Sequence, residues 1–241
     1  MILSHEHKFI FLKTRKTAGT SLEIALSKYC QERDIITSVG DKDNAIRASL
    51  GYLGPQNYIR YRYYFSWKKL FRWHDRKSDL FYHHMKAKKV KKIVGKEVWD
   101  SYFKFAIVRN PFEFVVSRYF WSNAKGNTEK SRENFKKWLL SRHVDQLCGN
   151  KNIISIDDTS VLDFTIRFEN FKEDLEKLAD LIGLPNDLYE TFKSIKAKSG
   201  IRPAHASVEY MFEGFSEGIQ LIKEIFEDEI LEYGYRVPNV V

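Results

Sequence analysis

The sequence predicts an α/β fold in which a central parallel β-sheet is flanked by helices on both faces. Two observations carry this prediction: short apolar runs recur along the chain, and amphipathic helical patterns separate them. Strands and helices that alternate in this way form a parallel sheet, because each helix returns the chain to the edge from which the next strand starts. Ligands of such sheets bind at the carboxyl ends of the strands.

Each strand-like run is short and mostly apolar, and the runs occupy residues 8–13, 35–39, 103–108, 153–156 and 164–168. Helical patterns occupy residues 20–30, 86–94, 111–123, 131–141 and 171–182, and a last long helix begins at Ile219. Longer loops are expected at 123–132 and 194–207. Because the chain has no internal repeat, no low-complexity block and no linker rich in proline and glycine, we expect a single domain over residues 1–241.

Composition bounds the class of protein. With 43% hydrophobic and 15% aromatic residues, the chain can bury a full core, and its net charge of +8 indicates an anionic partner. Cys30 and Cys148 are too few for a disulfide framework and lie in apolar contexts, which favours buried thiols. No run approaches the roughly 18 apolar residues of a membrane span, and the first residues do not resemble a signal peptide, so we expect a cytoplasmic protein.

The most informative segment follows the first predicted strand and reads Lys16-Thr17-Ala18-Gly19-Thr20-Ser21. A strand that feeds a helix through a turn of small residues directs several backbone N–H groups and the positive end of the helix dipole at one point. That arrangement suits a phosphate or a sulfate. Lys16 adds a mobile charge, and the hydroxyl groups of the segment add donors. The alternative is an ordinary strand-turn-helix in which Thr20 caps the helix.

A second segment suited to phosphate follows the strand at 103–108 and reads Val108-Arg109-Asn110-Pro111. The guanidinium of Arg109 offers planar, bidentate recognition of phosphate oxygens. Pro111 fits the first position of a helix, which leaves Asn110 as its cap. Ser117, about two turns into that helix, would reach a phosphate only if the helix runs beside it.

Together, the two segments resemble the nucleotide-binding signatures of sulfotransferases that use 3′-phosphoadenosine 5′-phosphosulfate, most closely the carbohydrate-type branch. The resemblance implies a P-loop-like sulfotransferase fold and a loop, Lys16 to Ser21, that holds the 5′-phosphosulfate. It also implies that Arg109 and Ser117 bind the 3′-phosphate. Arg15 stands where many relatives have proline, and its charge fits an anion-binding loop.

The resemblance reaches further along the chain. Ile166-Arg167-Phe168-Glu169-Asn170, with Asp174, looks like a later strand-helix element of the family, and the stretch from Phe226 to Tyr235 is similar to its C-terminal helix and tail. Residues 40–80 lie outside it. By this resemblance the chain is a transferase whose cosubstrate is the nucleotide sulfate donor, with no metal, and whose partner is a glycan or another hydroxyl acceptor.

Sulfuryl transfer requires alignment and charge stabilisation more than covalent participation. Lys16 is the candidate that neutralises the bridging oxygen as its bond to sulfur breaks. The acceptor hydroxyl must lose a proton, and by resemblance His84, in His84-Met85-Lys86-Ala87, is the base, with His83 in reserve. A packing or capping histidine is the structural alternative. The histidines have no spacing that suggests zinc.

Residues 58–73 interleave eight aromatic with five basic residues. They could stack on sugars or bases, or form an aromatic packing segment whose cations reach the solvent. The lysines between 86 and 92 predict a solvated helix face.

Two other classes compete with the transferase. A P-loop kinase or NTPase needs G-x-x-x-x-G-K-[ST], but Lys16 precedes Gly19, and only Asp157 and Asp158 could imitate a magnesium-binding strand end. A nucleic-acid-binding protein would explain the net charge but gives no reason for two phosphate-type loops at strand ends. We therefore favour the enzyme.

Overall fold

A computed structural model describes residues 1–65, 73–122, 131–142, 144–195, 197 and 200–239. In this part of the chain a five-stranded sheet has the order β3-β1-β2-β6-β9. The strands are β1 (Ile2–Ser4), β2 (Phe9–Phe11), β3 (Ile35–Ile36), β6 (Phe103–Val108) and β9 (Phe164–Arg167). Strands β2, β6 and β9 are parallel, and β1 is antiparallel to both β2 and β3. The predicted α/β class is confirmed. The antiparallel pair arises because only a short turn joins β1 to β2, too short for a crossover.

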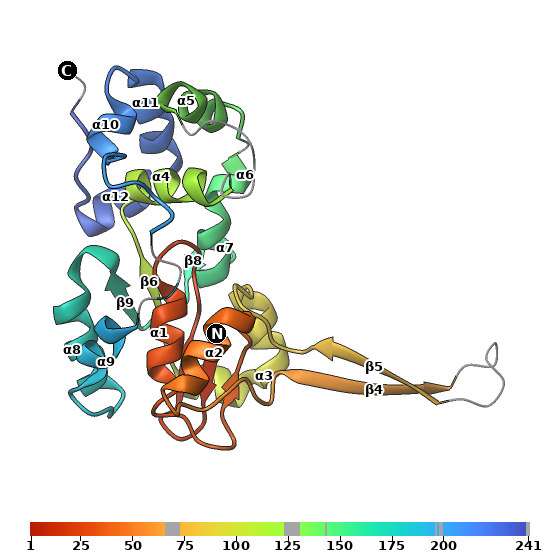
Figure 1. The fold of residues 1–241 in the computed structure, drawn as a ribbon. Helices are drawn as coiled ribbons and strands as arrows, with labels where there is room; N and C mark the ends of the chain where they lie inside the picture. Colours follow the sequence, from red (N-terminus) through yellow and green to blue (C-terminus); the bar gives the residue numbers. More distant parts are fainter. Residues whose placement is uncertain (66–72, 123–130, 143, 196, 198–199, 240–241) are drawn as a thin grey trace.

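The sheet is covered on both faces because its strands are apolar on both sides. Along the first strands, Ile2, Phe9 and Phe11 enter one core and Leu3 and Ile10 enter the other, as the two-residue period of a strand requires. The first core contains α1 (Gly19–Leu26), α8 (Phe171–Leu181) and α9 (Leu188–Ser194), and the second contains α3 (Ala87–Ser101) and α7 (Lys151–Ile154). Figure 1 shows α8 and α9 on the side of the sheet opposite α3.

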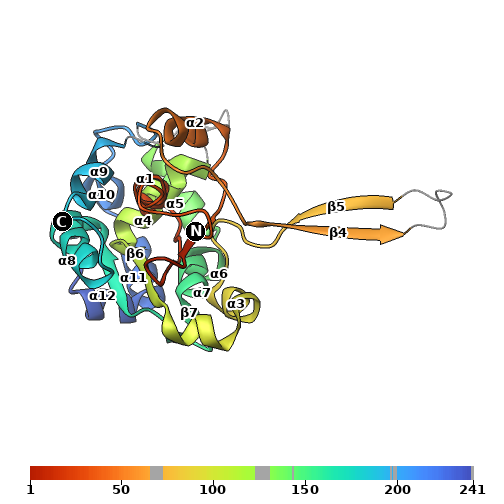
Figure 2. The ribbon, with the colours of Figure 1, turned by 90° about the horizontal axis from the view of Figure 1, so that it is seen from below.

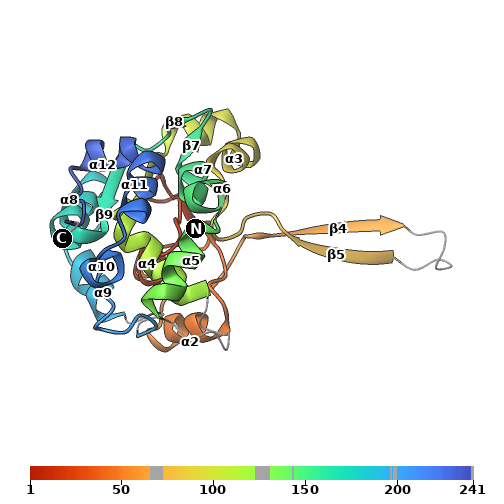
Figure 3. The ribbon, with the colours of Figure 1, turned by 90° about the horizontal axis from the view of Figure 1, so that it is seen from above.

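A third core lies beyond the carboxyl end of β6 and is formed mainly by helices. It is built from α4 (Pro111–Ser122), α5 (Arg132–Leu140), α10 (Val208–Phe212) and α11 (Ser216–Ile225). Figure 3, viewed from above, places this helical layer over the sheet. The chain leaves β6 directly into α4, so the start of α4 lies where the sheet meets the helical layer.

Three predicted elements differ from the structure. The run 153–156 is not a strand of the main sheet: α7 continues to Ile154, and β7 (Ser155–Ile156) pairs with β8 (Thr159–Ser160) in a separate hairpin. A run of three isoleucines and one serine does not distinguish a strand from a buried helical turn, and Ile153 is buried against α3. The strand predicted at 35–39 is only β3, and the last helix is two helices, α11 and α12 (Glu227–Tyr233), which Phe226 separates.

Several elements were not predicted. They are the strands β1, β4 (Ile59–Phe65), β5 (Trp73–Asp79) and β8, the helices α2 (Asp41–Ser49), α6 (Val144–Leu147), α9 and α10, and the short 3₁₀ helices η2 (Cys148–Asn150) and η3 (Phe168–Asn170). The lysines predicted to form a solvated helix face at Lys86–Lys92 are all exposed. Of the two cysteines, Cys30 is buried as expected, and burial raises the pKa of its thiol, whereas Cys148 is half-buried.

A two-stranded ribbon projects from the body of the molecule. Strand β4 (Ile59–Phe65) pairs with β5 (Trp73–Asp79) in antiparallel fashion, with Ile59 opposite Asp79 and Phe65 opposite Trp73. Figures 1 and 2 show the ribbon extending away from the sheet and its helices. The aromatic and basic side chains between residues 60 and 79 lie outside the described part of the structure, so the proposed contact with sugars stays a prediction.

Candidate functional site

A pocket of about 710 Å³ lies at the carboxyl ends of β2 and β6. It brings together the two phosphate-type segments and the two adjacent histidines. Its lining consists of residues 13–20 with Val39, His83, His84, Arg109, Ser117, Arg118, Trp121, Ser122, Phe168 and Ala197. Of the predicted residues, only Ser21 is not part of the lining, since it is buried in the first turn of α1.

The backbone of the loop after β2 has an unusual conformation. Lys16 and Ala18 have φ values of 62° and 56°, in the left-handed region that residues other than glycine seldom occupy and that recurs at functional sites. Helix α1 begins at Gly19, and the N–H of Leu22 donates to the carbonyl of Ala18. The N–H groups of the first turn precede this bond and have no partner within a helix. Ala18, not Thr20, is the N-cap residue, so the capping alternative for Thr20 does not hold.

Hydrogen bonds from distant segments hold this loop in place. The Thr14 hydroxyl donates to the carbonyl of Ile107 (2.5 Å), and the Thr17 hydroxyl lies 2.8 Å from that of Thr14. Because the Thr14 proton is already used, Thr17 donates to Thr14, and its hydroxyl is not a free donor for an anion in this conformation. The Asn150 side chain accepts from the N–H of Arg15 (2.8 Å) and donates to its carbonyl (3.0 Å).

The two lysines of the loop have different surroundings. Lys13 is buried and its Nζ lies 2.8 Å from the Glu23 carboxylate. Burial alone would raise the pKa of Glu23, but the Met1 amino group and Lys13 outweigh it and hold this pKa at about 2. Lys16 is half-buried, and its Nζ lies 4.1 Å from the centre of the Trp121 ring. Lys13 is thus held in an ion pair with Glu23, which also contacts the Met1 amino group, whereas the Lys16 side chain lies against the Trp121 ring.

The side chain of Lys13 approaches Gly19 closely. A Cβ at position 19 would lie 3.0 Å from Cγ of Lys13, tighter than nearly all real contacts of this kind. A larger residue would therefore displace the lysine that precedes the loop.

Arg109 is held rigidly between both segments. Its guanidinium donates to the carbonyl of Lys16 (3.1 Å) and to the carboxylate of Glu113 (2.8 Å), and it stacks at 4.0 Å over the Phe168 ring. Burial lowers the pKa of Arg109, and its Nε is buried without a hydrogen-bond partner in the described part of the chain.

The start of α4 has the predicted geometry. Pro111 is the first helical residue, and the side chain of Asn110 accepts from the N–H of Phe112 (2.9 Å). Glu169 accepts from the N–H of Asn110 (2.8 Å), a structural contact. Ser117 is half-buried, further along the same helix, and lines the pocket with Arg109.

His84 has the tautomer that a base requires. Its Nδ1 lies 2.9 Å from the carbonyl oxygen of Lys13, which can only accept, so Nδ1 carries the proton and Nε2 has a lone pair. Burial, opposed by this hydrogen bond, lowers the pKa of His84 to about 3. Its φ of 62° is a third left-handed position in this pocket. His83 is exposed, and its ring centre lies 5.0 Å from that of His84.

Two further arginines, Arg167 and Arg202, and two aspartates lie outside this pocket. Arg167 forms two side-chain hydrogen bonds with Asp174, and Arg202 donates to Glu113 and to the carbonyl of Ala206. Asp157 and Asp158, which could imitate a magnesium-binding strand end, lie in the turn between β7 and β8. The two aspartates therefore do not support the kinase alternative.

Sequence reasoning missed several contributors, namely Glu113, Arg118, Trp121, Asn150 and Phe168. Trp121 follows Ser117 by four positions, so helical periodicity from Ser117 would have found it, but the same periodicity does not point to Arg118, the next residue along the helix. Nothing local identifies Asn150, because its partner Arg15 is 135 positions away.

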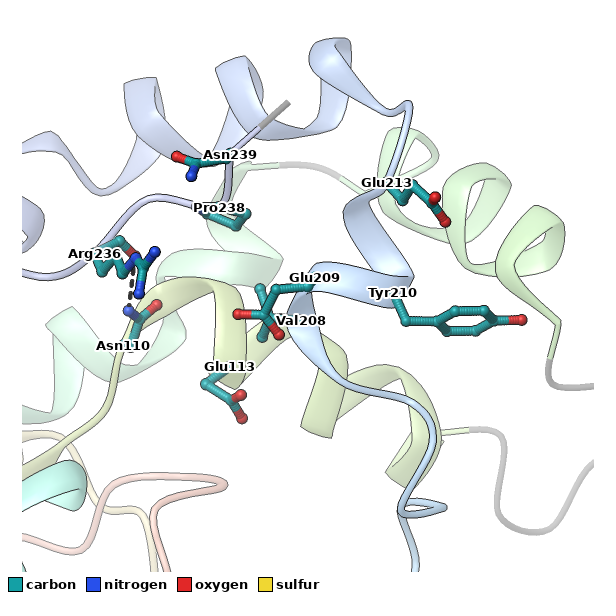
Figure 4. Close-up of a pocket in the computed structure, with 9 residues that line it drawn as sticks. All are labelled: Asn110, Glu113, Val208, Glu209, Tyr210, Glu213, Arg236, Pro238 and Asn239. Carbon is teal, nitrogen blue, oxygen red and sulfur yellow. Dashed lines mark hydrogen bonds between the residues drawn. The ribbon is translucent and has the colours of Figure 1, made fainter. Parts of the chain in front are cut away.

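A second pocket, of about 570 Å³, lies on the other side of the start of α4 and is shown in Figure 4. Glu113, Glu209 and Glu213 line it, together with Arg236, whose carbonyl accepts from the Asn110 side chain (3.1 Å). Because three carboxylates line this pocket, it does not suit a polyanion. Glu113 belongs to both sites, since it lines this pocket while it pairs with Arg109.

Among the described residues, none of the helices is both long enough and apolar enough to cross a bilayer. The described residues also contain no group of three or more His, Cys, Asp and Glu placed to hold a metal ion.

Comparison with known proteins identifies the family. Residues 1–236 match the model of the sulfotransferase family, and the chain belongs to that family. A protein from Archaeoglobus fulgidus that bears the name "Uncharacterized protein" is 33% identical over 112 residues, which cover 43% of this chain and 87% of that relative. No solved structure matches the chain.

Proposed function

We propose that this sulfotransferase moves a sulfuryl group from 3′-phosphoadenosine 5′-phosphosulfate to a carbohydrate hydroxyl. The observation that carries the proposal is the single pocket that joins the loop 15–20, Arg109 with Ser117, and His84. The loop and Arg109 are two separate anion-binding groups. A nucleotide with a 5′-phosphosulfate and a 3′-phosphate presents two separate anions.

In this proposal the nucleotide lies across the pocket. Arg109 and Ser117 bind the 3′-phosphate, and the contact of Arg109 with the Lys16 carbonyl fixes its distance from the loop. The backbone N–H groups of the loop and the positive end of α1 receive the phosphosulfate. Within this loop, Thr17 acts through its backbone N–H because its hydroxyl is bonded to Thr14, and Lys16 acts through its side-chain charge.

Transfer forms one S–O bond and breaks another. The acceptor oxygen attacks sulfur in line with the bridging oxygen, and the bisphosphate leaves with the electron pair of the broken S–O bond. Lys16 neutralises the charge that develops on the bridging oxygen. His84 Nε2 takes the proton of the acceptor hydroxyl while the Lys13 carbonyl holds the opposite ring nitrogen.

The test is calorimetry with 3′-phosphoadenosine 5′-phosphate, 5′-AMP and ATP. We expect the bisphosphate to bind far more tightly than either competitor, and Arg109→Ala to reduce that preference because it removes the group that recognises the extra phosphate. Arg33→Ala, at an exposed position outside the pocket, is the matched control. Equal affinity for AMP and the bisphosphate would exclude the proposal, and a requirement for magnesium in turnover would favour a kinase instead.

A further inference from the structure

The ribbon of β4 and β5 lies outside the pocket and carries most of the net charge of the chain. Residues 59–79 contain seven lysines and arginines and two aspartates, so they account for five of the eight net positive charges. In the described structure the two strands form a sheet of their own, and Figures 1 and 2 show it extending away from the body. An isolated pair of strands is marginally stable in water, because it has no core in which to bury its apolar residues. The ribbon therefore needs a partner that covers it.

One face of the ribbon is cationic. Alternate residues of a strand lie on opposite faces, so Arg60 and Arg62 share a face with Arg76, which is opposite Arg62 in the register of the two strands. Like charges that are directly opposite each other destabilise an antiparallel pair. An anion bound to this face would remove the repulsion between Arg62 and Arg76.

The other face is mainly aromatic. Its aromatic positions are Tyr61, Tyr63, Phe65 and Trp73. Asp75, Lys77 and Asp79 also lie on this face, nearer to the body of the molecule than the last register pair. At the outer end both faces are aromatic, because Tyr64 lies on the face of the arginines. The two strands thus combine arginines nearer the body with aromatic residues at the outer end.

This distribution of residues fits a lipid surface better than a soluble polyanion. A glycan or a nucleic acid would neutralise the arginine face and leave the aromatic face in water. The interface of a bilayer covers both faces of an arm that enters it. Tyrosine and tryptophan are enriched at that depth, because one end of each ring system is apolar and the other is polar. Anionic headgroups at the same depth attract arginine and lysine.

We propose that the ribbon docks the protein on a bilayer that contains anionic lipids. The outer end of the two strands, at Phe65 and Trp73, enters the interfacial region, while Arg60, Arg62 and Arg76 bind lipid phosphates. The three outermost register pairs span about 7 Å, because a strand rises about 3.3 Å per residue, and interfacial segments enter a bilayer by roughly 5–10 Å. This role goes beyond sulfuryl transfer and does not depend on it.

Flotation with vesicles tests the proposal. The full chain is mixed with vesicles of phosphatidylcholine alone or of phosphatidylcholine with phosphatidylglycerol, and the bound fraction is measured at a series of lipid concentrations. We expect much tighter binding to the anionic vesicles, and we expect it to weaken as the salt concentration rises, because salt screens exposed charges. Equal binding to both kinds of vesicle, or binding to neither, overturns the proposal.

Charge variants assign the binding to the ribbon. Arg60→Gln combined with Arg62→Gln should weaken binding to anionic vesicles about thirtyfold, since each cation near such a surface contributes about fivefold. Lys172→Gln combined with Lys177→Gln removes the same charge from exposed positions of α8, which Figures 1 and 2 show on the side of the body away from the ribbon. This control should lose less than about twofold, because its charges lie beyond the Debye length of about 8 Å. Equal losses in the two double variants would mean that net charge alone adsorbs the protein, and would overturn the proposal.

Aromatic variants separate a lipid surface from a soluble polyanion. Phe65→Ser combined with Trp73→Ser should weaken binding to anionic vesicles by about tenfold or more, because large apolar side chains no longer leave water, and should keep the affinity for heparin. A fluorophore attached through His74→Cys, in a Cys148→Ser background, should shift to shorter wavelength with anionic vesicles, and one attached through Lys172→Cys should not. Normal vesicle binding by the aromatic variant, or no shift at position 74, would make the ribbon a polyanion site and overturn the proposal. None of these measurements uses the nucleotide, so their failure leaves the proposed transferase function intact.

Discussion

Lys16 has a left-handed backbone conformation, and its charged side chain lines the pocket. Its carbonyl accepts from Arg109, so the side chain that we assign to the leaving group is attached to the residue that recognises the 3′-phosphate. The charge of Lys16 is needed most when the bridging oxygen becomes a leaving group.

Lys16→Ala should therefore lower kcat by about ten- to a hundredfold, the value of a hydrogen bond to a charged group, and weaken binding of the bisphosphate less. Single-turnover kinetics and calorimetry measure the two losses. Lys92→Ala, which removes an exposed charge, is the control. Equal losses in turnover and in product affinity would mean that Lys16 only binds.

His84 should give an unusual pH profile. In the free enzyme its pKa is lowered to about 3 by burial, so it is neutral at all ordinary pH values. The ascending limb of kcat/KM, which reports the free enzyme, should lie well below pH 6.5. The limb of kcat should lie at higher pH, because the bound anionic donor favours the charged imidazolium. His84→Ala should lose roughly 10²–10⁴-fold in kcat, and His83→Ala much less. Near-normal turnover by His84→Ala would place the base elsewhere.

At the scale of elements, the loop that follows β2 is held in place by a residue of another element. Asn150, at the end of η2, holds the backbone of Arg15 through one donor and one acceptor. Asn150→Ala should weaken binding of the bisphosphate about tenfold, because two hydrogen bonds of roughly 0.5–1.5 kcal/mol each are lost. Asn150→Asp should lose at least as much, because its carboxylate cannot donate to the Arg15 carbonyl and repels the bound anion. Asn152→Ala changes an exposed residue on α7 and should bind normally. Calorimetry checks all three, and unchanged affinity in Asn150→Ala would show that the loop is preorganised without this contact.

The two segments that follow β2 and β6 could be predicted from the sequence, because the signals for them are local. The strand-turn-helix at Lys16–Ser21 and the capped helix after Arg109 each depend on neighbouring residues, and both were predicted. The contact of His84 with the Lys13 carbonyl joins residues 71 positions apart, and the stacking of Arg109 on Phe168 joins two strand ends. Such contacts depend on how the strands are ordered, and no local pattern encodes them. The prediction of a strand at 153–156 was wrong for another reason, because the apolar residues of this run fit a helical turn equally well.

For the whole molecule, stability depends on a buried carboxylate beneath the site. Glu23, on α1, is fully buried and lies 2.8 Å from Nζ of Lys13 and 3.8 Å from Arg47. Glu23→Gln leaves buried cations without a counter-charge and should lower the free energy of unfolding by about 3–5 kcal/mol. Glu213→Gln removes a carboxylate that is 62% exposed and should cost no more than about 1 kcal/mol. Urea denaturation measures both.

The pH dependence of this effect has a definite sign. Because the pKa of Glu23 is lowered to about 2 in the folded state, its contribution is complete above the ordinary glutamate pKa and is lost as the pH falls towards 2. The stability difference between the wild type and Glu23→Gln should therefore shrink on acidification. A difference that stays constant from pH 7 to pH 2 would contradict the ion-pair explanation.

The projecting ribbon of β4 and β5 determines how the molecule scatters X-rays in solution. A compact chain of 241 residues has a radius of gyration of about 18 Å. Each strand of the ribbon has seven residues and spans about 23 Å, largely outside the body in Figures 1 and 2. The pair-distance distribution of the monomer should therefore carry a long, low tail, and removal of residues 60–78 should abolish that tail. A distribution without the tail in the intact protein would mean that the ribbon folds against the body, and the molecule would then present a continuous surface where it now has an arm.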